Sequence, residues 1–330
     1  MADEPSIAFQ KSIVNTGLNS AVLLAFLVGA YTVIHFGTLY LYMTRKAPQR
    51  LLVAGAMSAL WILAMMLLGS IWFGVNWCIV VQGATREDIV RCSPPAWIAL
   101  IQDLAEFPIV VIADVLLIWR CFNVWDKSLR ATAIPLFLML AEIGTFLAAL
   151  IAISVDKFKP NSKQATVYNS LLAAAFFLSF ASTLVTTVLI GYRIWSLTRH
   201  RTTPMGRYKH IFEILVQSSA VYALAMLAQA IQGFLPESFA FKYPLREWAL
   251  QTYMVNVVYP IACIAPTIMV ARVALLDSDN MHTSTTRVLS DLQFQLGSTR
   301  LDDTRTRLDT AEVELENLDG LDTREKGLTT

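Results

Sequence analysis

The sequence predicts an all-α fold, a bundle of seven transmembrane helices followed by a polar C-terminal tail. Hydrophobic residues make up 55% of the chain and charged residues only 15%, whereas soluble domains carry about 25% charged residues. Seven apolar stretches are each roughly 20–26 residues long, which is the length that crosses a bilayer as a helix. These stretches are continuous, while the strands of a membrane barrel would be short and alternating.

The seven stretches determine the expected domain organisation. They are Ser20–Met43, Leu51–Phe73, Trp97–Trp119, Ala131–Val155, Val167–Tyr192, Ile211–Phe234 and Trp248–Val270. We therefore expect residues 1–19 to be an extracellular N-terminus and residues 20–275 to be the membrane domain. Residues 276–330 are acidic and rich in Ser and Thr, which predicts a disordered cytoplasmic tail.

Basic residues are distributed unevenly between the connections. The segments Thr44–Arg50, Arg120–Arg130 and Arg193–Lys209 together hold eleven Lys and Arg residues, against eight on the opposite side. Because Lys and Arg are enriched in cytoplasmic loops, we expect the N-terminus outside and the C-terminus in the cytoplasm, in the plasma membrane. The expected partners are the lipid bilayer and a cytoplasmic signalling protein that contacts the Arg193–Lys209 loop and the tail. We expect no nucleic-acid partner.

Acidic residues inside the third apolar stretch are the main candidates for a ligand or cation site. They are Asp103, Glu106 and Asp114. At 100° per residue, Asp103 and Asp114 lie within about 20° of each other and Glu106 lies about 60° to one side, so the three share one helix face. Charge in hydrocarbon is costly, so this face should line the bundle interior. Alternatively, the shallower Asp103 and Glu106 are hydrated near the headgroups or bonded to neighbouring helices.

Two further polar residues are candidates for the same site. Glu142 is the only acid of the fourth stretch, and Thr145 or a polar group across the bundle is its expected partner. Asn256 lies in the seventh stretch, where Pro260 and Pro266 predict a bent or broken helix. Such polar residues also hold transmembrane helices together, and that role is the alternative to ligand contact.

Arg120 and two cysteines are candidates for other roles. Arg120 ends the third stretch and is a candidate cytoplasmic switch, although an interfacial arginine that extends to the headgroups is the alternative. Cys78 and Cys92 lie in one outer connection, where the oxidising environment favours a disulfide over two free thiols.

The sequence shows no motif or cluster of residues that is typical of an enzyme or a metal site. The four histidines are His35, His200, His210 and His282, which do not predict a metal site. No lysine lies in the seventh stretch to attach retinal, and no Walker, G-x-S-x-G or Rossmann motif occurs. We therefore expect a protein that is not an enzyme and that carries no cofactor.

Three segments resemble a known group of proteins. They are ADVLLIWRCFNVW (Ala113–Trp125), LIGYRIWSLTR (Leu189–Arg199) and IAPTIMVARVAL (Ile264–Leu275). Together they resemble a large family of uncharacterised seven-span membrane proteins from mushroom-forming fungi, over roughly residues 20–275. The resemblance implies an integral membrane protein with receptor-like topology, and it implies no ligand or catalytic residues.

Two hypotheses for function follow. The first is a receptor-like protein that senses a small extracellular ligand or cation near Asp103 and Glu106, and that responds by moving the third, sixth and seventh spans. The second is a cation- or proton-coupled transporter, which the buried acids favour. The absence of an internal repeat in the sequence counts against the transporter.

Overall fold

A computed structural model describes residues 7–44, 50–83, 85, 88–89, 92, 94–155, 162–199, 205–234 and 249–272. All of them belong to one unit of the chain, Met1–Arg272. The predicted disordered tail, residues 276–330, lies outside the described residues, as do the first six residues of the expected extracellular N-terminus.

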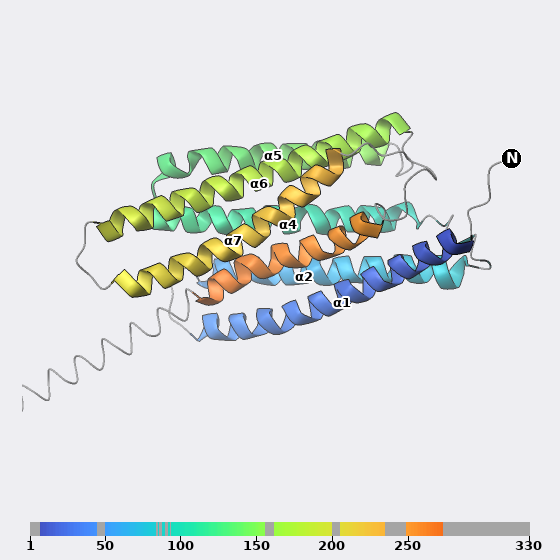
Figure 1. The fold of residues 1–330 in the computed structure, drawn as a ribbon, viewed down its shortest axis with the longest axis horizontal. Coiled ribbons are helices and arrows are strands. Elements are labelled where there is room, and N and C mark those ends of the chain that lie inside the picture. The colour runs from blue at the N-terminus through green and yellow to red at the C-terminus, as the bar shows by residue number, and fades with distance from the viewer. Residues whose placement is uncertain are drawn as a thin grey trace, which may run out of the picture. The chain divides into compact units, whose positions relative to one another are not determined.

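The described residues form long helices and no strand (Figure 1). The helices are α1 (Ile7–Met43), α2 (Arg50–Asn76), the π-helical turn η1 (Trp77–Val81), α4 (Ala96–Val124), α5 (Leu129–Val155), α6 (Ser162–Arg199) and α7 (Met205–Phe234). One more helix, Ala249–Arg272, is called here the final helix. Each of the seven apolar stretches overlaps one of these long helices, so the all-α prediction is confirmed.

Six of the helices are long and apolar enough to cross a membrane: α1, α2 with η1, α4, α5, α6 and the final helix. The remaining helix, α7, overlaps the sixth apolar stretch, but the structure describes its side chains only at 217 and 219–233, which is shorter than a membrane span.

Helix α1 is longer than its apolar stretch. It begins at Ile7 and has 37 residues, which gives a length of about 55 Å against about 30 Å for the hydrocarbon core. The helix therefore includes the polar segment that precedes Ser20, because backbone hydrogen bonding continues once a helix has formed.

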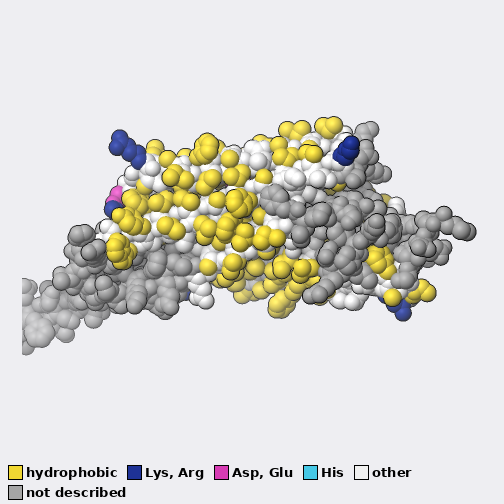
Figure 2. Space-filling model, turned by 45° about the horizontal axis from the view of Figure 1, so that its top comes forward, with side chains coloured by type: hydrophobic (Ala, Val, Ile, Leu, Met, Phe, Trp, Pro, Cys, Tyr) yellow, Lys and Arg dark blue, Asp and Glu magenta, His cyan; other side chains and the backbone are white. Residues whose placement is uncertain are grey.

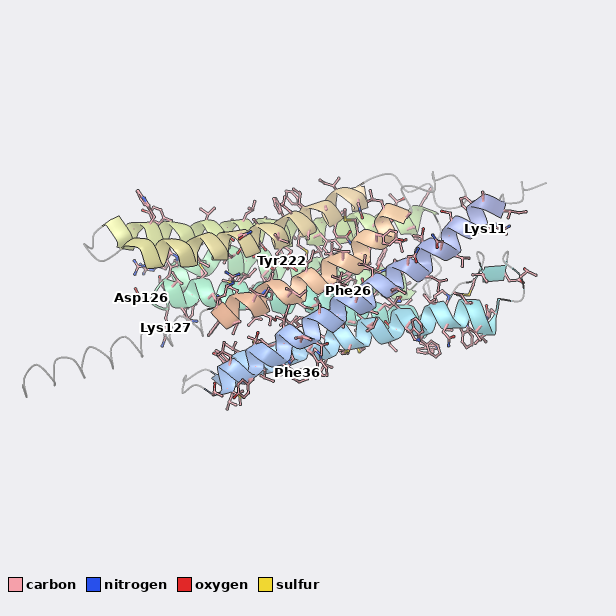
Figure 3. The ribbon with its side chains drawn as sticks, turned by 60° about the horizontal axis from the view of Figure 1, so that its bottom comes forward. Lys11, Phe26, Phe36, Asp126, Lys127 and Tyr222 are labelled. Atoms are coloured by element: carbon pink, nitrogen blue, oxygen red, sulfur yellow. A yellow bond between two sulfur atoms is a disulfide. The ribbon has the colours of Figure 1, made fainter. Side chains whose placement is uncertain are left out.

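Successive helices run in opposite directions along the bundle (Figure 1). We call one end the disulfide end, because Cys78 and Cys92 lie there, joined by a disulfide. The opposite end holds Trp125, Asp126 and Lys127 and is called the Trp125 end (Figure 3). Neighbouring pairs include α1 with α2, α2 with α4, α5 with α6, and α6 with α7, and α4 packs against both α5 and α6.

Helix α4 lies in the core of the bundle, while much of the apolar surface faces outward. Ala105, Ile109 and Ala113 of α4 are fully buried. In contrast, Phe26 of α1 is 72% exposed and points away from the bundle, as does Phe36 (Figure 3). On the face in Figure 2, hydrophobic side chains cover the middle and charged ones lie near the ends. Such a surface suits lipid rather than water.

Prolines lie within α4, α5 and the final helix without interrupting them. Of the two outcomes expected for the final helix, bent or broken, the structure excludes the break, because the helix continues through Pro260 and Pro266. A proline inside a helix has no N–H group and so leaves the carbonyl four residues earlier without its usual donor. For Pro260, that carbonyl belongs to Asn256.

Candidate functional site

The three acids of α4 and Glu142 of α5 form two separate pairs at different depths. Asp114 and Glu142 make the deep acid pair, and Asp103 and Glu106, nearer the disulfide end, make the shallow acid pair. Glu106 and Asp114 are eight residues apart on one helix, which separates the two layers by about 12 Å.

Asp114 is the centre of a buried hydrogen-bond network. Its side chain is 1% exposed and accepts hydrogen bonds from Ser179 at 2.8 Å, Tyr222 at 3.1 Å and Thr183 at 3.4 Å. Ser179 and Thr183 lie one turn apart on α6, and Tyr222 lies in the middle of α7. The hydroxyls of Ser179 and Tyr222 are also within hydrogen-bond distance, at 3.3 Å. The network thus joins α4, α6 and α7.

Glu142 reaches the same network from α5. It is fully buried, with 0% exposure, and it interacts electrostatically with Asp114 and Tyr222. No hydroxyl or N–H group of the described residues donates to either carboxyl oxygen of Glu142, and its hydrogen-bonding neighbour is the carboxyl of Asp114. The expected partner Thr145 instead donates to the backbone carbonyls of Ala141 and Glu142, at 3.1 and 2.8 Å.

The shallow acid pair is held by two tyrosines. Tyr259 of the final helix donates a hydrogen bond of 2.6 Å to Glu106, and Tyr168 of α6 donates one of 3.4 Å to Asp103. Both acids are half-buried and close enough for their charges to interact. They face neighbouring helices, which is the interior position that the helical periodicity predicted.

Asn256 lies one turn from Tyr259 on the final helix, toward the disulfide end. Its side chain is 5% exposed, and its Oδ1 has no hydrogen-bond partner among the described residues. The same is true of Asn169 Nδ2, Gln229 Oε1 and Gln232 Oε1. These amides have hydrogen-bonding capacity that the described part of the protein does not use, and they lie in the same half of the bundle as Asp103 and Glu106.

A close contact holds α7 against α6 near these amides. A Cβ atom built on Gly233 would lie 2.8 Å from Cβ of Ala173 and 3.2 Å from the carbonyl oxygen of Asn169. Real Cβ atoms do not come that close, so a glycine is needed at this crossing. Small residues commonly allow such close approach between membrane helices.

Arg120 lies apart from both acid pairs. It is half-buried at the Trp125 end of α4 and interacts electrostatically with Tyr42 of α1. The six-residue separation from Asp114 corresponds to about 9 Å along the helix. The structure therefore places this switch candidate between α4 and α1, and not within the acid network.

Another cluster at the Trp125 end connects α4 to α6. Arg193 forms an ion pair with Asp126 and lies 5.5 Å from the centre of the Trp125 ring. Trp125 Nε1 donates to the carbonyl of Leu189 at 3.2 Å. This is the one ion pair found among the described residues, so neither acid pair has a described Lys or Arg as its ionic partner.

The described part of the chain holds no group of three or more His, Cys, Asp or Glu residues placed to bind a metal ion. His35, within α1, is buried and stacks on Trp61 of α2, with ring centres 5.7 Å apart. Cys121 and Cys263 are free and buried.

Sequence reasoning missed the hydroxyl groups that bind the acids. They are Tyr168, Ser179, Thr183, Tyr222 and Tyr259. The four-residue spacing of Ser179 and Thr183 was visible, and so was the position of Tyr222 far from a span end. The sequence did not show which helices are neighbours, and that determines which hydroxyl bonds to which acid.

Apolar helices long enough to cross a bilayer, packed around buried acids and hydroxyls, define a helical integral membrane protein. No family model, curated protein or solved structure matches the chain.

Proposed function

We propose that this chain is a seven-helix plasma-membrane protein of receptor-like topology that senses a small, positively charged extracellular ligand or a cation. The binding site is the shallow acid pair, Asp103 and Glu106, together with Tyr168, Tyr259 and Asn256. The observation that carries the proposal is the 2.6 Å hydrogen bond between Tyr259 and Glu106, two residues from different helices, with the unpartnered amide oxygen of Asn256 one helical turn from Tyr259.

The proposed seven-span topology requires that α7 also crosses the membrane. Tyr222 in its middle bonds to Asp114, and Tyr222, Met226 and Ala230 belong to the same buried core as α4. A helix that contributes to the core of a membrane bundle is supported by protein contacts there, so glutamines in that part do not need to face lipid.

The orientation rests on charge. The Trp125 end coincides with the three connections that hold eleven basic residues, and we assign this end to the cytoplasm. The disulfide end is then extracellular, where a disulfide is stable. The shallow acid pair therefore lies on the side of the membrane from which an extracellular ligand arrives.

A ligand at this site contacts the helices that carry the response. Glu106 lies on α4, Tyr168 on α6 and Tyr259 on the final helix, so a cation that attracts both acids changes the packing of these three helices. The change reaches the Trp125 end through α4 and α6, which are joined there by Trp125 and Arg193. The Arg193–Lys209 loop is the proposed contact for a cytoplasmic signalling partner, and most of its side chains lie outside the described residues.

The test uses the purified full chain in lipid nanodiscs. Thermal unfolding is measured with a panel of primary and quaternary amines, each compared with the neutral alcohol of the same carbon skeleton. We expect at least one amine to raise Tm of the wild type while its alcohol does not. Glu106→Gln should abolish that increase, because the amide keeps the shape of the side chain but removes its charge.

Tyr253→Phe is the matched control, since Tyr253 is a half-buried tyrosine of the same helix that is not bonded to Glu106. It should retain the response to the amine. An amine response that survives in both Glu106→Gln and Asp103→Asn would contradict the proposed site.

A cation- or proton-coupled transporter is the second candidate, and one observation favours it. Acids occur at two depths along the interior face of α4, as a transport path requires. Proteoliposomes loaded with a pH-sensitive or potential-sensitive dye distinguish the two. A transporter shows a flux that Asp103→Asn and Glu106→Gln abolish, whereas a receptor shows no flux.

A further inference from the structure

The deep acid pair is a second site, distinct from the shallow one. We propose that Asp114 and Glu142, with the hydroxyls of Ser179 and Thr183, bind one monovalent metal cation, Na⁺, in the middle of the bundle. This inference does not depend on ligand binding at the shallow pair, and it assigns the deep pair a partner of defined chemistry.

Asp114 has partial compensation for its charge. Three hydroxyl groups donate hydrogen bonds to its two oxygens, from Ser179, Thr183 and Tyr222. Hydrogen bonds to a charged carboxylate are stronger than those between neutral groups, and several of them stabilise a buried carboxylate. The network is therefore built for an ionised Asp114.

Glu142 has no such compensation among the described residues. It is fully buried and comes from a different helix, no hydroxyl or N–H group donates to either of its oxygens, and its hydrogen-bonding neighbour is the carboxyl of Asp114. A buried carboxylate without a partner is very costly in a membrane interior. Two carboxyls in contact need one positive charge between them. A cation there attracts both acids and takes the place of the donors that Glu142 lacks, and a shared proton is the competing occupant.

The chemistry of the donors selects the kind of cation. All the groups are oxygens, from two carboxylates and the hydroxyls, and oxygen donors suit hard cations rather than zinc or copper. Ca²⁺ requires six to eight oxygen ligands, commonly from several carboxylates. Because three donors already balance part of the charge on Asp114, a single additional positive charge fits the site better than two.

The site and the tyrosine that donates to Asp114 together join four helices. Asp114 belongs to α4, Glu142 to α5, Ser179 and Thr183 to α6, and Tyr222 to α7. A cation bound there favours the packing described here over any arrangement that separates α5 from α4 and α6. Na⁺ should therefore stabilise the folded protein by mass action.

The experiment measures thermal unfolding of the full chain in nanodiscs, in chloride salts of Na⁺, K⁺ or N-methylglucamine at equal ionic strength. We expect Na⁺ to raise Tm of the wild type by about 3–5 °C, in a saturable manner. Glu142→Gln should lose this response. In Na⁺-free buffer, Glu142→Gln should unfold at the same temperature as the wild type or higher, because the uncompensated charge is gone.

Two serines of α6 provide a matched pair. Ser179 and Ser182 are both buried, but only Ser179 donates to Asp114. Ser179→Ala should shift the Na⁺ dependence to at least tenfold higher concentration, whereas Ser182→Ala should leave it unchanged. Direct binding of radioactive ²²Na⁺ to the same samples gives a readout that does not depend on unfolding.

Two results would overturn the proposal: a wild-type Tm and ²²Na⁺ binding that show no preference for Na⁺ over N-methylglucamine, or a Na⁺ response that Glu142→Gln retains. In the first case the pair holds a proton instead. Glu106→Gln should keep its Na⁺ response while losing the amine response, so the two proposed sites fail or succeed separately.

Discussion

Tyr222 of α7 donates a 3.1 Å hydrogen bond to Asp114 of α4, and this bond connects two buried side chains that are 108 residues apart in the sequence. It places the polar centre of α7 inside the bundle. The contact also ties α7 to α4, a helix that is not its neighbour in the sequence.

Removal of the Tyr222 hydroxyl tests that contact. Tyr222→Phe keeps the ring but takes one of three donors from Asp114, which should lower the free energy of unfolding by about 1.5–3 kcal/mol. The measurement is the Tm of the full chain in nanodiscs. Tyr253→Phe removes a half-buried hydroxyl that bonds to neither acid pair and should change stability much less. Equal effects of the two substitutions would mean that the bond to Asp114 contributes nothing specific.

The contact of Gly233 with α6 should not tolerate a side chain. Gly233→Ala places a Cβ 2.8 Å from that of Ala173, so the helices must separate, at a cost of about 1–3 kcal/mol. Gly144 of α5 is the control, because a Cβ added there meets no neighbouring side chain or helix within 4 Å. Gly144→Ala should be neutral or stabilising by up to about 1 kcal/mol, since alanine favours helix. If both variants melt at the wild-type temperature, the α6–α7 crossing is looser than described.

The disulfide between Cys78 and Cys92 should stabilise the disulfide end. It closes a loop with a sequence separation of 14 residues, for which loop-closure entropy gives about 3 kcal/mol. The double variant Cys78→Ala with Cys92→Ala should therefore have a lower Tm, and reduction of the wild type should lower Tm equally. Reduction should leave Tm of the double variant unchanged. A drop in that variant would show that the reductant acts elsewhere.

The ion pair at the Trp125 end should contribute little by itself. Asp126 is largely exposed, and exposed pairs are worth about 0–1 kcal/mol. Asp126→Asn should thus change Tm by less than Trp125→Phe, which removes the hydrogen bond to Leu189 and reduces the ring beneath Arg193. A larger effect of Asp126→Asn would indicate that its charge holds α4 to α6 more strongly than its exposure suggests.

The positions of the acids were predictable, but their partners were not. Helical periodicity placed Asp103, Glu106 and Asp114 on one face, and the structure turns that face toward α6, α7 and the final helix. Periodicity describes one helix at a time, so it left the three acids as a single candidate site. The structure instead separates Asp114 from Asp103 and Glu106, because α5 brings the carboxyl of Glu142 beside Asp114 and not beside Asp103.

The sequence by itself determined that the protein is helical and apolar, where the helices lie, and that acids must face inward, because these features depend on residue composition and on hydrogen bonding within each helix. Tertiary structure decided which hydroxyl meets which acid, that the final helix continues through its prolines, and that the acids form two layers. These outcomes depend on how helices distant in sequence pack together, and pairwise contacts of that kind leave no periodic signal in the chain.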